Sequence, residues 1–353
     1  MRLYLIFIIT LFLTISCARE QFHQKTFYVF GTLVEISISG ADEKTANHAI
    51  DTIAADFQTL HREWHAWQAS DLTALNFAFA QGKTGTVKSL QLLSLLKESK
   101  ILYAQSEGLF NPAIGKLIEL WGFHRDELSS MTPPTQSQIS ALTTLAPTMD
   151  DIDIQGNSVH SRNPTVQLDF GAFAKGYAVD LAIENLRKMG IENAIVNAGG
   201  NLKAIGQRGN RTWQIGIRHP SGQGVLAGVT IHGEESVVTS GNYERYYEYQ
   251  GEKYAHIINP RTGMPVQHFT SVTVIDSSAA RADAASTALS IAGLEDWHRI
   301  AQQMGIQYVI LVTAQGELLM NPAMKKRLQF SSQENFKIKI SKPLIINTQS
   351  HIE

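Results

Sequence analysis

Three polar segments in the second half of the chain have the residue types of a chemical site. They are residues 239–245, 256–263 and 282–287. The first two are predicted to be turn-rich loops that flank a hairpin, and the third opens a helix. Because loops and helix ends from separate elements can meet, we expect their polar groups to line one pocket.

Asp283 and Thr287 carry the oxygen donors of a candidate metal site. They lie four residues apart on the predicted helix, so a carboxylate and a hydroxyl share one face. Oxygen ligands favour magnesium or calcium over zinc. Alternatively, Asp283 is an ordinary acidic residue near a helix start, where negative charge is favourable. The neighbouring polar segments favour the metal interpretation.

Residues 169–177 have the pattern of a phosphate-binding loop. The segment joins a predicted strand end to a helix start, with Gly171 at the turn and Lys175 in the first helical turns. Free amides at a helix start, assisted by a lysine, can hold a phosphate. In the alternative interpretation, Asp169 only caps the helix and Lys175 is solvated. Residues 197–201 form a second tight loop, whose glycine pair can also be a simple turn.

His256 and a tryptophan pair are further candidates for the site. His256 ends an alternating strand and precedes the Asn-Pro-Arg-Thr-Gly turn, so it could orient a ligand, accept a proton or be structural. Trp64 and Trp67 lie three residues apart on a predicted helical pattern. They either pack in the core or form a stacking wall for a ring system.

The spacing of apolar residues predicts the elements that hold these segments. Helices are expected at residues 42–64, 89–105, 172–189 and 279–292, the last two ended by Gly190 and Gly293. A surface excursion with a short helix is expected at 131–147. Strands are predicted at 26–39, 166–169, 194–197, 213–217, 225–231, 246–258, 271–275 and 308–313. Their mixed order favours an α+β or mixed α/β domain over a regular wound sheet.

Composition limits the classes of protein that the chain can belong to. Its 353 residues, 44% hydrophobic and 18% charged, are enough for one large domain or two ordinary domains with buried cores. The formal net charge of -2 and a pI near 6.6 provide no basic surface for phosphate neutralisation. We therefore do not expect nucleic acid as a partner.

The N-terminus resembles a bacterial lipoprotein signal peptide. Arg2 precedes an apolar run at residues 3–13, and Ser16 precedes Cys17, the only cysteine. The run is short for a membrane span, and a small residue before a lone cysteine suits cleavage and lipidation. We expect a signal peptide at 1–17, lipidation at Cys17, a tether at 18–25 and a periplasmic body held on a bacterial membrane. An uncleaved anchor is the alternative.

Taken together and in order, these segments resemble the ApbE family of FAD:protein FMN transferases. The matching stretches are 30–32, 70–76, 108–123, 168–180, 197–206, 239–245, 256–265 and 282–287. The resemblance implies one T-fold-like α+β domain over residues 26–330, with mixed strands and packed helices, followed by a strand or tail at 331–353. It also implies that FAD and Mg²⁺ bind, and that FMN passes to a threonine hydroxyl of an acceptor protein.

The resemblance also assigns roles to individual residues. Asp283 and Thr287 would coordinate the metal together with a backbone oxygen of Ala172. The residues expected to contact FAD are Trp67, Leu109, Phe110, Asn111, Asp169, Lys175 and His256. Three positions depart from the family pattern: Phe30 replaces Met, Asn111 stands where many members have Asp, and Ala198 replaces a frequent Gly.

The implied reaction is attack of the threonine oxygen on the FMN phosphorus, with AMP as the leaving group. His256 is the candidate base and Asp283 is committed to the ion. Two alternatives are a flavin-binding lipoprotein without transfer activity and an Mg²⁺-dependent FAD pyrophosphatase that gives FMN and AMP. Because the family serves membrane redox proteins, the expected acceptor is a membrane redox subunit.

Overall fold

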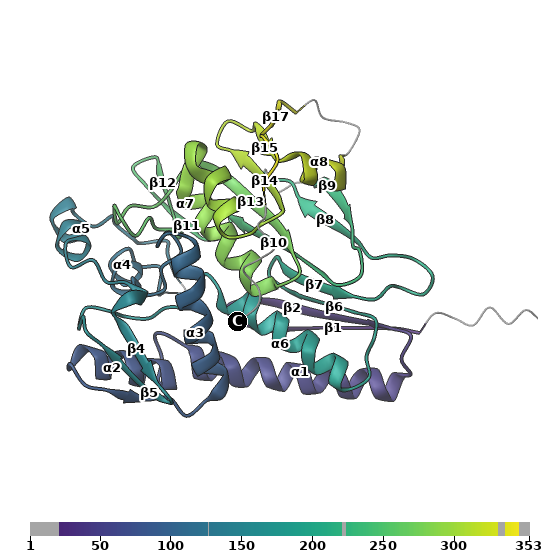
Figure 1. The fold of residues 1–353 in the computed structure, drawn as a ribbon, viewed down its shortest axis with the longest axis horizontal. Helices are drawn as coiled ribbons and strands as arrows, with labels where there is room; N and C mark the ends of the chain where they lie inside the picture. The colour runs from purple at the N-terminus through teal and green to yellow at the C-terminus, as the bar shows by residue number, and fades with distance from the viewer. Residues whose placement is uncertain (1–20, 126, 221–223, 331–335, 346–353) are drawn as a thin grey trace, which may run out of the picture.

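A nine-stranded sheet forms the centre of the chain in the computed structural model (Figure 1). The structure describes residues 21–125, 127–220, 224–330 and 336–345. The strands are, in spatial order, β1 (Phe22–Val29), β2 (Thr32–Ser39), β6 (Ala194–Ala198), β7 (Asn201–Ile205), β10 (Glu235–Gly241), β13 (Phe269–Asp276), β14 (Tyr308–Thr313), β15 (Leu318–Met320) and β17 (Ile338–Ile340). Neighbours pair antiparallel except β15 and β17, which are parallel.

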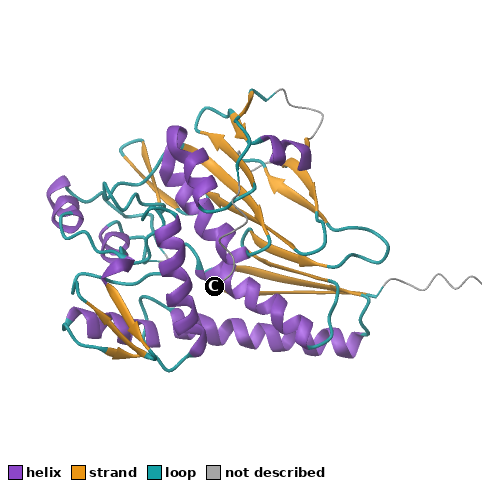
Figure 2. Cartoon of the chain, viewed as in Figure 1, coloured by secondary structure: helices purple, strands orange, loops and turns teal. Residues whose placement is uncertain are grey.

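The four long helices cover one face of this sheet, and smaller elements surround it (Figure 2). The helices are α1 (Glu43–Trp64), α2 (Asp71–Ala80), α3 (Leu90–Gln105), α4 (Gly115–Leu120), α5 (Gln136–Thr143), α6 (Ala174–Lys188), α7 (Ala279–Gln303) and α8 (Pro322–Arg327). The smaller sheets contain β3 (Gly85–Thr86), β4 (Ile152–Gln155) and β5 (Ser158–Ser161); β8 (Gln214–Arg218), β9 (Val225–Thr230) and β16 (Leu328–Phe330); and the hairpin β11 (Tyr246–Tyr249) with β12 (Glu252–Ala255). This is the mixed α+β domain that the sequence predicts.

Strand alternation divides the apolar side chains between two cores. Val238 and Val274 join the large core beneath α1, α3, α6 and α7. Their neighbours Val237 and Ile275 join a smaller core together with residues of β8, β9 and α8. Because successive strand residues point to opposite faces, the central sheet is buried on both sides.

Helices α1, α3 and α6 begin and end close to their predicted bounds. Asp42 caps α1 by accepting a hydrogen bond from the Thr45 N–H at 3.0 Å, and Ser89 caps α3 in the same way. Ile50, Ile53 and other apolar residues at helical spacing in α1 are buried. The short helix expected within 131–147 is α5.

The strand predicted at 26–39 is instead the hairpin β1–β2. The chain reverses at Phe30 and Gly31, whose φ angles are 54° and 69°. Phe22 pairs with Ser39, so residues 22–25, which were expected to belong to a tether, are part of the sheet. Residues 36–39 of β2 pair with residues 22–25 and so include them in the sheet. Cys17 and the predicted signal peptide lie outside the described residues.

Three further predictions differ from the structure. Residues 246–258 contain a second hairpin, β11–β12, which turns at Gln250 and Gly251. Residues 166–169 form no strand but only a bridge between Gln167 and Ile114. Helix α7 breaks at Gly293 and then continues to Gln303. In addition, residues 239–241, expected in a loop, complete β10.

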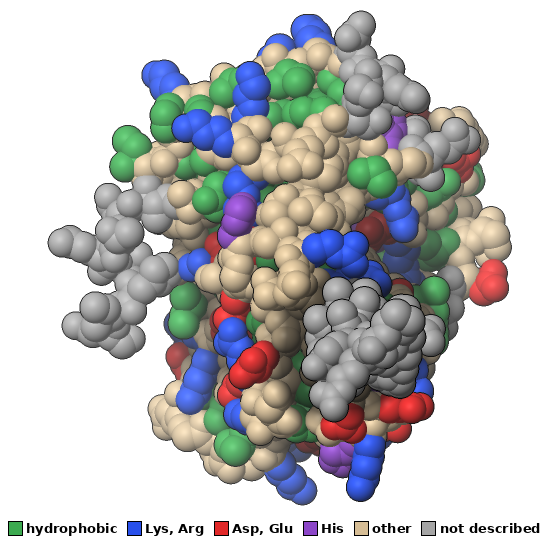
Figure 3. All heavy atoms as spheres, turned by 90° about the vertical axis from the view of Figure 1, so that its right-hand side faces the viewer, with side chains coloured by type: hydrophobic (Ala, Val, Ile, Leu, Met, Phe, Trp, Pro, Cys, Tyr) green, Lys and Arg blue, Asp and Glu red, His purple; other side chains and the backbone are tan. Residues whose placement is uncertain are grey.

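The surface has no region of a single charge on the face shown in Figure 3, where basic, acidic and apolar side chains are interspersed. Among the described residues, no helix has the length and apolar character needed to cross a membrane. Near the end of the described residues, β17 pairs with β15 at the edge of the central sheet, and the predicted division at 331–353 stays a prediction.

Candidate functional site

The Asp283 carboxylate lies where α6, α7 and β7 meet. The residue is 3% exposed. Its Oδ2 accepts hydrogen bonds from the backbone N–H of Gly176 in α6 and from Nδ2 of Asn201 in β7, each at 3.0 Å. Burial raises the pKa of Asp283 to about 6, although the positive charge of Lys175 and these two hydrogen bonds oppose the shift.

A glycine is required where the two helices approach each other. A Cβ on Gly176 would lie 2.3 Å from the carbonyl oxygen of Ala279 and 2.8 Å from Cβ of Asp283. Both distances are far inside normal van der Waals contact. Only glycine therefore lets α6 come close enough to α7 for its amide to reach the buried carboxylate.

The two other predicted metal ligands, one on α7 and one just before α6, offer unpaired oxygens. Thr287 lies one turn after Asp283 on α7, is half-buried, and its hydroxyl has no hydrogen-bond partner within the described residues. The N–H of Gly176 donates to Asp283 instead of to Ala172, four residues earlier. In the described part of the chain, the carbonyl oxygen of Ala172 consequently accepts no backbone hydrogen bond.

These donors fit a hard cation. A carboxylate, a hydroxyl and a carbonyl are the oxygen ligands that Mg²⁺ and Ca²⁺ accept. Across the described ranges, no group of three or more His, Cys, Asp or Glu side chains is arranged to hold a metal ion. A metal at Asp283 would therefore need Thr287, Ala172 and oxygens of a ligand to complete its coordination.

Glu244 belongs to the same site as Asp283 and Lys175, although the sequence pattern predicts no individual role for it. It lies in the turn after β10, where its N–H donates to the Gly241 carbonyl at 3.3 Å. The residue is exposed to solvent, yet neighbouring protein groups partly desolvate its carboxylate. This desolvation and the charge of Asp283 raise the pKa of Glu244 to about 7, against the opposing effect of Lys175. Its position depends on the chain reversal after β10, which residue spacing does not reveal.

Lys175 connects these carboxylates to His256. Its side chain is half-buried, its Nζ donates to the Gly171 carbonyl at 3.3 Å, and its charge acts on Asp283, Glu244 and His256. The ammonium of Lys175 can pair with a phosphate oxygen, but a cation bound at Asp283 would be needed to offset the two carboxylates before an anionic ligand is favoured.

His256 is held as a neutral proton acceptor. Its Nδ1 lies 3.1 Å from the carbonyl oxygen of Arg245. Because a carbonyl can only accept, Nδ1 carries the proton and Nε2 keeps a free lone pair. Burial, together with the charges of Lys175 and Arg245, lowers the pKa of His256 to about 4. The ring also makes an edge contact with Phe123.

Asp169 binds Trp67 instead of capping α6. Its carboxylate accepts hydrogen bonds from Trp67 Nε1 at 3.0 Å and from the Gly171 N–H at 2.7 Å. Protein atoms packed around the carboxylate raise the pKa of Asp169, although both hydrogen bonds oppose this. The Trp67 ring lies 5.2 Å from the His124 ring, whereas Trp64 is buried in the core. Trp64 thus belongs to the core, whereas Trp67 binds the site residue Asp169.

The segment 109–111 turns its side chains into the protein. Leu109 and Phe110 are buried in the large core. Asn111 donates to the Pro147 carbonyl at 2.9 Å and accepts from the Ala113 N–H at 3.0 Å. Any contact of Leu109 or Phe110 with FAD would thus have to come from their backbone, and the role of the three residues stays a prediction.

Comparison with known proteins identifies the family. A model described as the ApbE family matches residues 30–310. The chain belongs to the ApbE family. An FAD:protein FMN transferase of Rhodobacter capsulatus is 44% identical over 309 residues, which are 86% of this chain. The chain spans only 58% of that relative's length. A protein of the same name from Vibrio cholerae is 30% identical over 322 residues, covering 88% of this chain and 94% of its own.

Solved ApbE structures have the same fold. The crystal structure of the ApbE protein from Thermotoga maritima has a TM-score of 0.80 and 27% identity, and covers 88% of this chain and all of its own. The flavin transferase ApbE from Vibrio cholerae has a TM-score of 0.74, with the same identity and coverage. These matches confirm the predicted fold class and family.

Proposed function

We propose that this ApbE chain is an FAD:protein FMN transferase. It would move FMN from FAD to a threonine hydroxyl of an acceptor protein, in a reaction that depends on Mg²⁺. The observation that carries the proposal is the buried Asp283 carboxylate, with Thr287 one turn further on α7, a carbonyl at Ala172 without a backbone partner in the described residues, and the charge of Lys175 acting on both Asp283 and His256. The names of the curated relatives support the same activity.

The reaction balances as the replacement of a phosphoanhydride bond by a phosphodiester bond. The threonine oxygen forms a bond to the FMN phosphorus, the bond from that phosphorus to the oxygen of the AMP phosphate breaks, and AMP leaves. The threonine proton passes to a base. When bound at Asp283, Thr287 and Ala172, Mg²⁺ supplies positive charge to the pyrophosphate region.

The chain's own residues then bind and orient the reacting groups. Lys175 would hold a phosphate oxygen and offset its charge. His256 Nε2 would accept the threonine proton, since Nδ1 is already committed to the Arg245 carbonyl. An anionic ligand offsets the positive charges of Lys175 and Arg245, which lower the pKa of His256. A bound anion would thus oppose part of this lowering, while burial, its largest cause, remains.

Incubation of the purified protein with FAD, Mg²⁺ and a candidate acceptor tests this function. Transfer predicts flavin fluorescence on the acceptor band in a denaturing gel and one AMP per labelled acceptor. Free FMN with AMP would indicate a pyrophosphatase, and intact FAD would indicate a binding protein. Replacement of the acceptor threonine by Val is the matched control and should abolish labelling.

We further propose that the protein is a periplasmic lipoprotein held on a bacterial membrane through Cys17. The sequence before Cys17 supports this, and the acceptor would then be a membrane redox subunit exposed to the same compartment. Metabolic labelling with a fatty acid is the test. The wild-type chain should incorporate the label and Cys17→Ser should not; equal labelling of both would contradict the anchor.

A further inference from the structure

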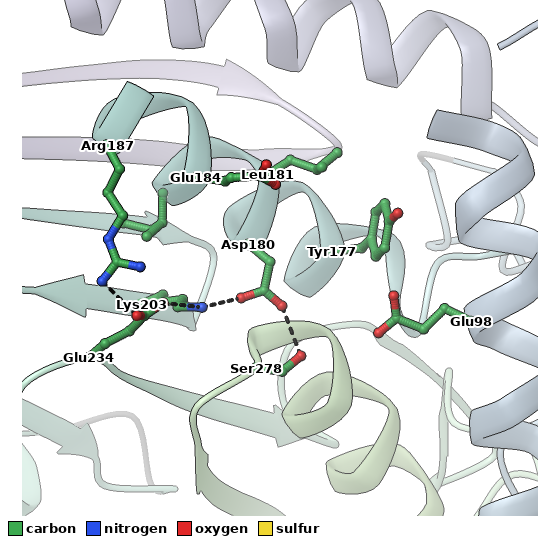
Figure 4. Close-up of a pocket in the computed structure, with 10 residues that line it drawn as sticks. Glu98, Tyr177, Asp180, Leu181, Glu184, Arg187, Lys203, Glu234 and Ser278 are labelled. Atoms are coloured by element: carbon green, nitrogen blue, oxygen red, sulfur yellow. Dashed lines mark hydrogen bonds and ion pairs between the residues drawn. The ribbon is translucent and has the colours of Figure 1, made fainter. Parts of the chain in front are cut away.

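Asp180 on α6 binds the first turn of α7 beside a cavity of about 390 Å³ (Figure 4). Its carboxylate accepts hydrogen bonds from the Ser278 hydroxyl at 2.9 Å, the Ala279 N–H at 3.1 Å and the Ala280 N–H at 2.9 Å. These amides have no partner inside their own helix. A negative charge at a helix N-terminus is also favourable. Asp180 thus fixes the start of the helix that carries Asp283.

Lys203 on β7 holds Asp180 from the side of the sheet. Its Nζ lies 2.7 Å from Oδ1 of Asp180 and 2.9 Å from Oε1 of Glu234, and its side chain is only 8% exposed. Burial alone would lower the pKa of Lys203, but the two carboxylates outweigh burial and raise it. Arg187 completes the cluster through an ion pair with Glu234 (Figure 4). Lys203 therefore stays charged and holds Asp180 through this ion pair.

The Asp180 and Asp283 carboxylates both connect α6, α7 and β7. Asp283 belongs to α7 and binds α6, whereas Asp180 belongs to α6 and binds α7. Asp283, from α7, accepts from the amide of Gly176 in α6 and from Asn201 in β7. Asp180, from α6, accepts from the first amides of α7 and from Lys203 in β7. Gly176 and Asp180 lie one helical turn apart. Asn201 and Lys203 lie two residues apart and so point to the same face of the sheet.

We propose that Asp180, held by Lys203, is a positioning residue that fixes the Asp283 carboxylate for metal binding. This inference rests on the proposed metal role of Asp283. Without the Asp180 contacts, the first turn of α7 loses three hydrogen bonds to α6. The Asp283 carboxylate, one turn further on, is then no longer held at a fixed distance from Ala172 and the Gly176 amide. Metal ligands need such outer contacts to keep their orientation.

Mn²⁺ titration followed by electron paramagnetic resonance tests the inference without measuring activity. The purified full chain, saturated with FAD, is compared with Asp180→Asn and Lys203→Met. Both variants should weaken Mn²⁺ binding by roughly 10- to 100-fold, the usual effect of removing an outer contact of a metal ligand. FAD affinity measured without metal should remain within about twofold of wild type, because Asp180 makes no contact with the predicted FAD residues.

Lys188→Met is the matched control on the same helix. Lys188 is 65% exposed and pairs only with Glu184 on the surface, so Mn²⁺ affinity should not change. If Asp180→Asn does not fold, Ser278→Ala is tested in its place; it removes one donor to Asp180 together with the hydroxyl that caps the Arg281 N–H at the start of α7. A severalfold weaker Mn²⁺ affinity is then expected.

Asp283→Asn separates failure of this inference from failure of the proposed function. Loss of Mn²⁺ binding in Asp283→Asn, together with wild-type binding in folded Asp180→Asn and Lys203→Met, would overturn the positioning role alone. Wild-type Mn²⁺ binding in Asp283→Asn would contradict the metal site itself, and the positioning role with it. Weakened binding in the Asp180 and Lys203 variants but not in Lys188→Met supports the inference.

Discussion

His256 combines a fixed tautomer with a low proton affinity. The Arg245 carbonyl fixes the proton on Nδ1, and burial lowers the pKa of the ring to about 4. We expect His256→Gln to reduce kcat by a factor of about 10² to 10⁴, as for loss of a general base. The acid limb of the kcat/KM profile should stay near pH 6, because it belongs to Asp283. A limb that disappears in the variant would assign the titration to His256 instead.

Asp283 must lose its proton before it can bind a metal ion. Since burial raises the pKa of Asp283 to about 6, the carboxyl group is ionised above that pH and protonated below it. Mg²⁺ affinity should therefore be constant above about pH 7 and fall by about tenfold per pH unit below pH 6. Calorimetric titration of the FAD-bound protein measures this dependence. An affinity that is unchanged down to pH 5 would show that Asp283 is not a ligand.

Residue types and spacing predicted part of the site. The helical spacing of Asp283 and Thr287 placed two oxygens on one face, and the structure keeps both on α7. The spacing did not show that Asn201 binds Asp283 or that Glu244 stands beside it. Both contacts depend on pairing and turns between strands far apart in sequence, which local patterns do not encode.

Gly176 sets the distance between the two helices of the site. We expect Gly176→Ala to lower the free energy of unfolding by about 1–3 kcal/mol, since the new Cβ would collide with the Ala279 carbonyl and overpack the contact. Flavin transfer should fall as well. Gly228→Ala is the control, because its Cβ would meet nothing closer than 3.8 Å. Urea denaturation compares the two variants, and equal stability would contradict the close-contact argument.

Helices were predicted better than strands, for a physical reason. Caps and the 3.6-residue period are local, so α1 and α3 could be placed from the sequence. The alternation of apolar and polar residues continues through a tight turn. It therefore predicts a single strand where the structure has the hairpin β1–β2, and again where it has β11–β12. In the first hairpin, Phe30 adopts a positive φ, a conformation that favours glycine or asparagine. Because a phenylalanine stands there, the residue types do not indicate the turn.

The whole domain should respond to its ligands as one unit. Under the proposed function, the metal and FAD would bind beside Asp283, where α6 and α7 pack on β7 of the central sheet, and would stabilise the folded state against complete unfolding. With FAD present, Mg²⁺ at about 100 times its dissociation constant should raise Tm by on the order of 5 °C. Asp283→Asn should lose this shift. Thermal denaturation followed by circular dichroism measures both, and an equal shift in the variant would place the metal elsewhere.

In the proposed site, one divalent ion lies between Asp283, Thr287 and Ala172 and faces the pyrophosphate of FAD. Anomalous diffraction from crystals grown with FAD and Mn²⁺ tests it most directly. We expect a manganese peak bound by oxygens of these three residues and by a pyrophosphate oxygen. A peak bound by other residues, or a pyrophosphate that lies away from Asp283, would contradict it.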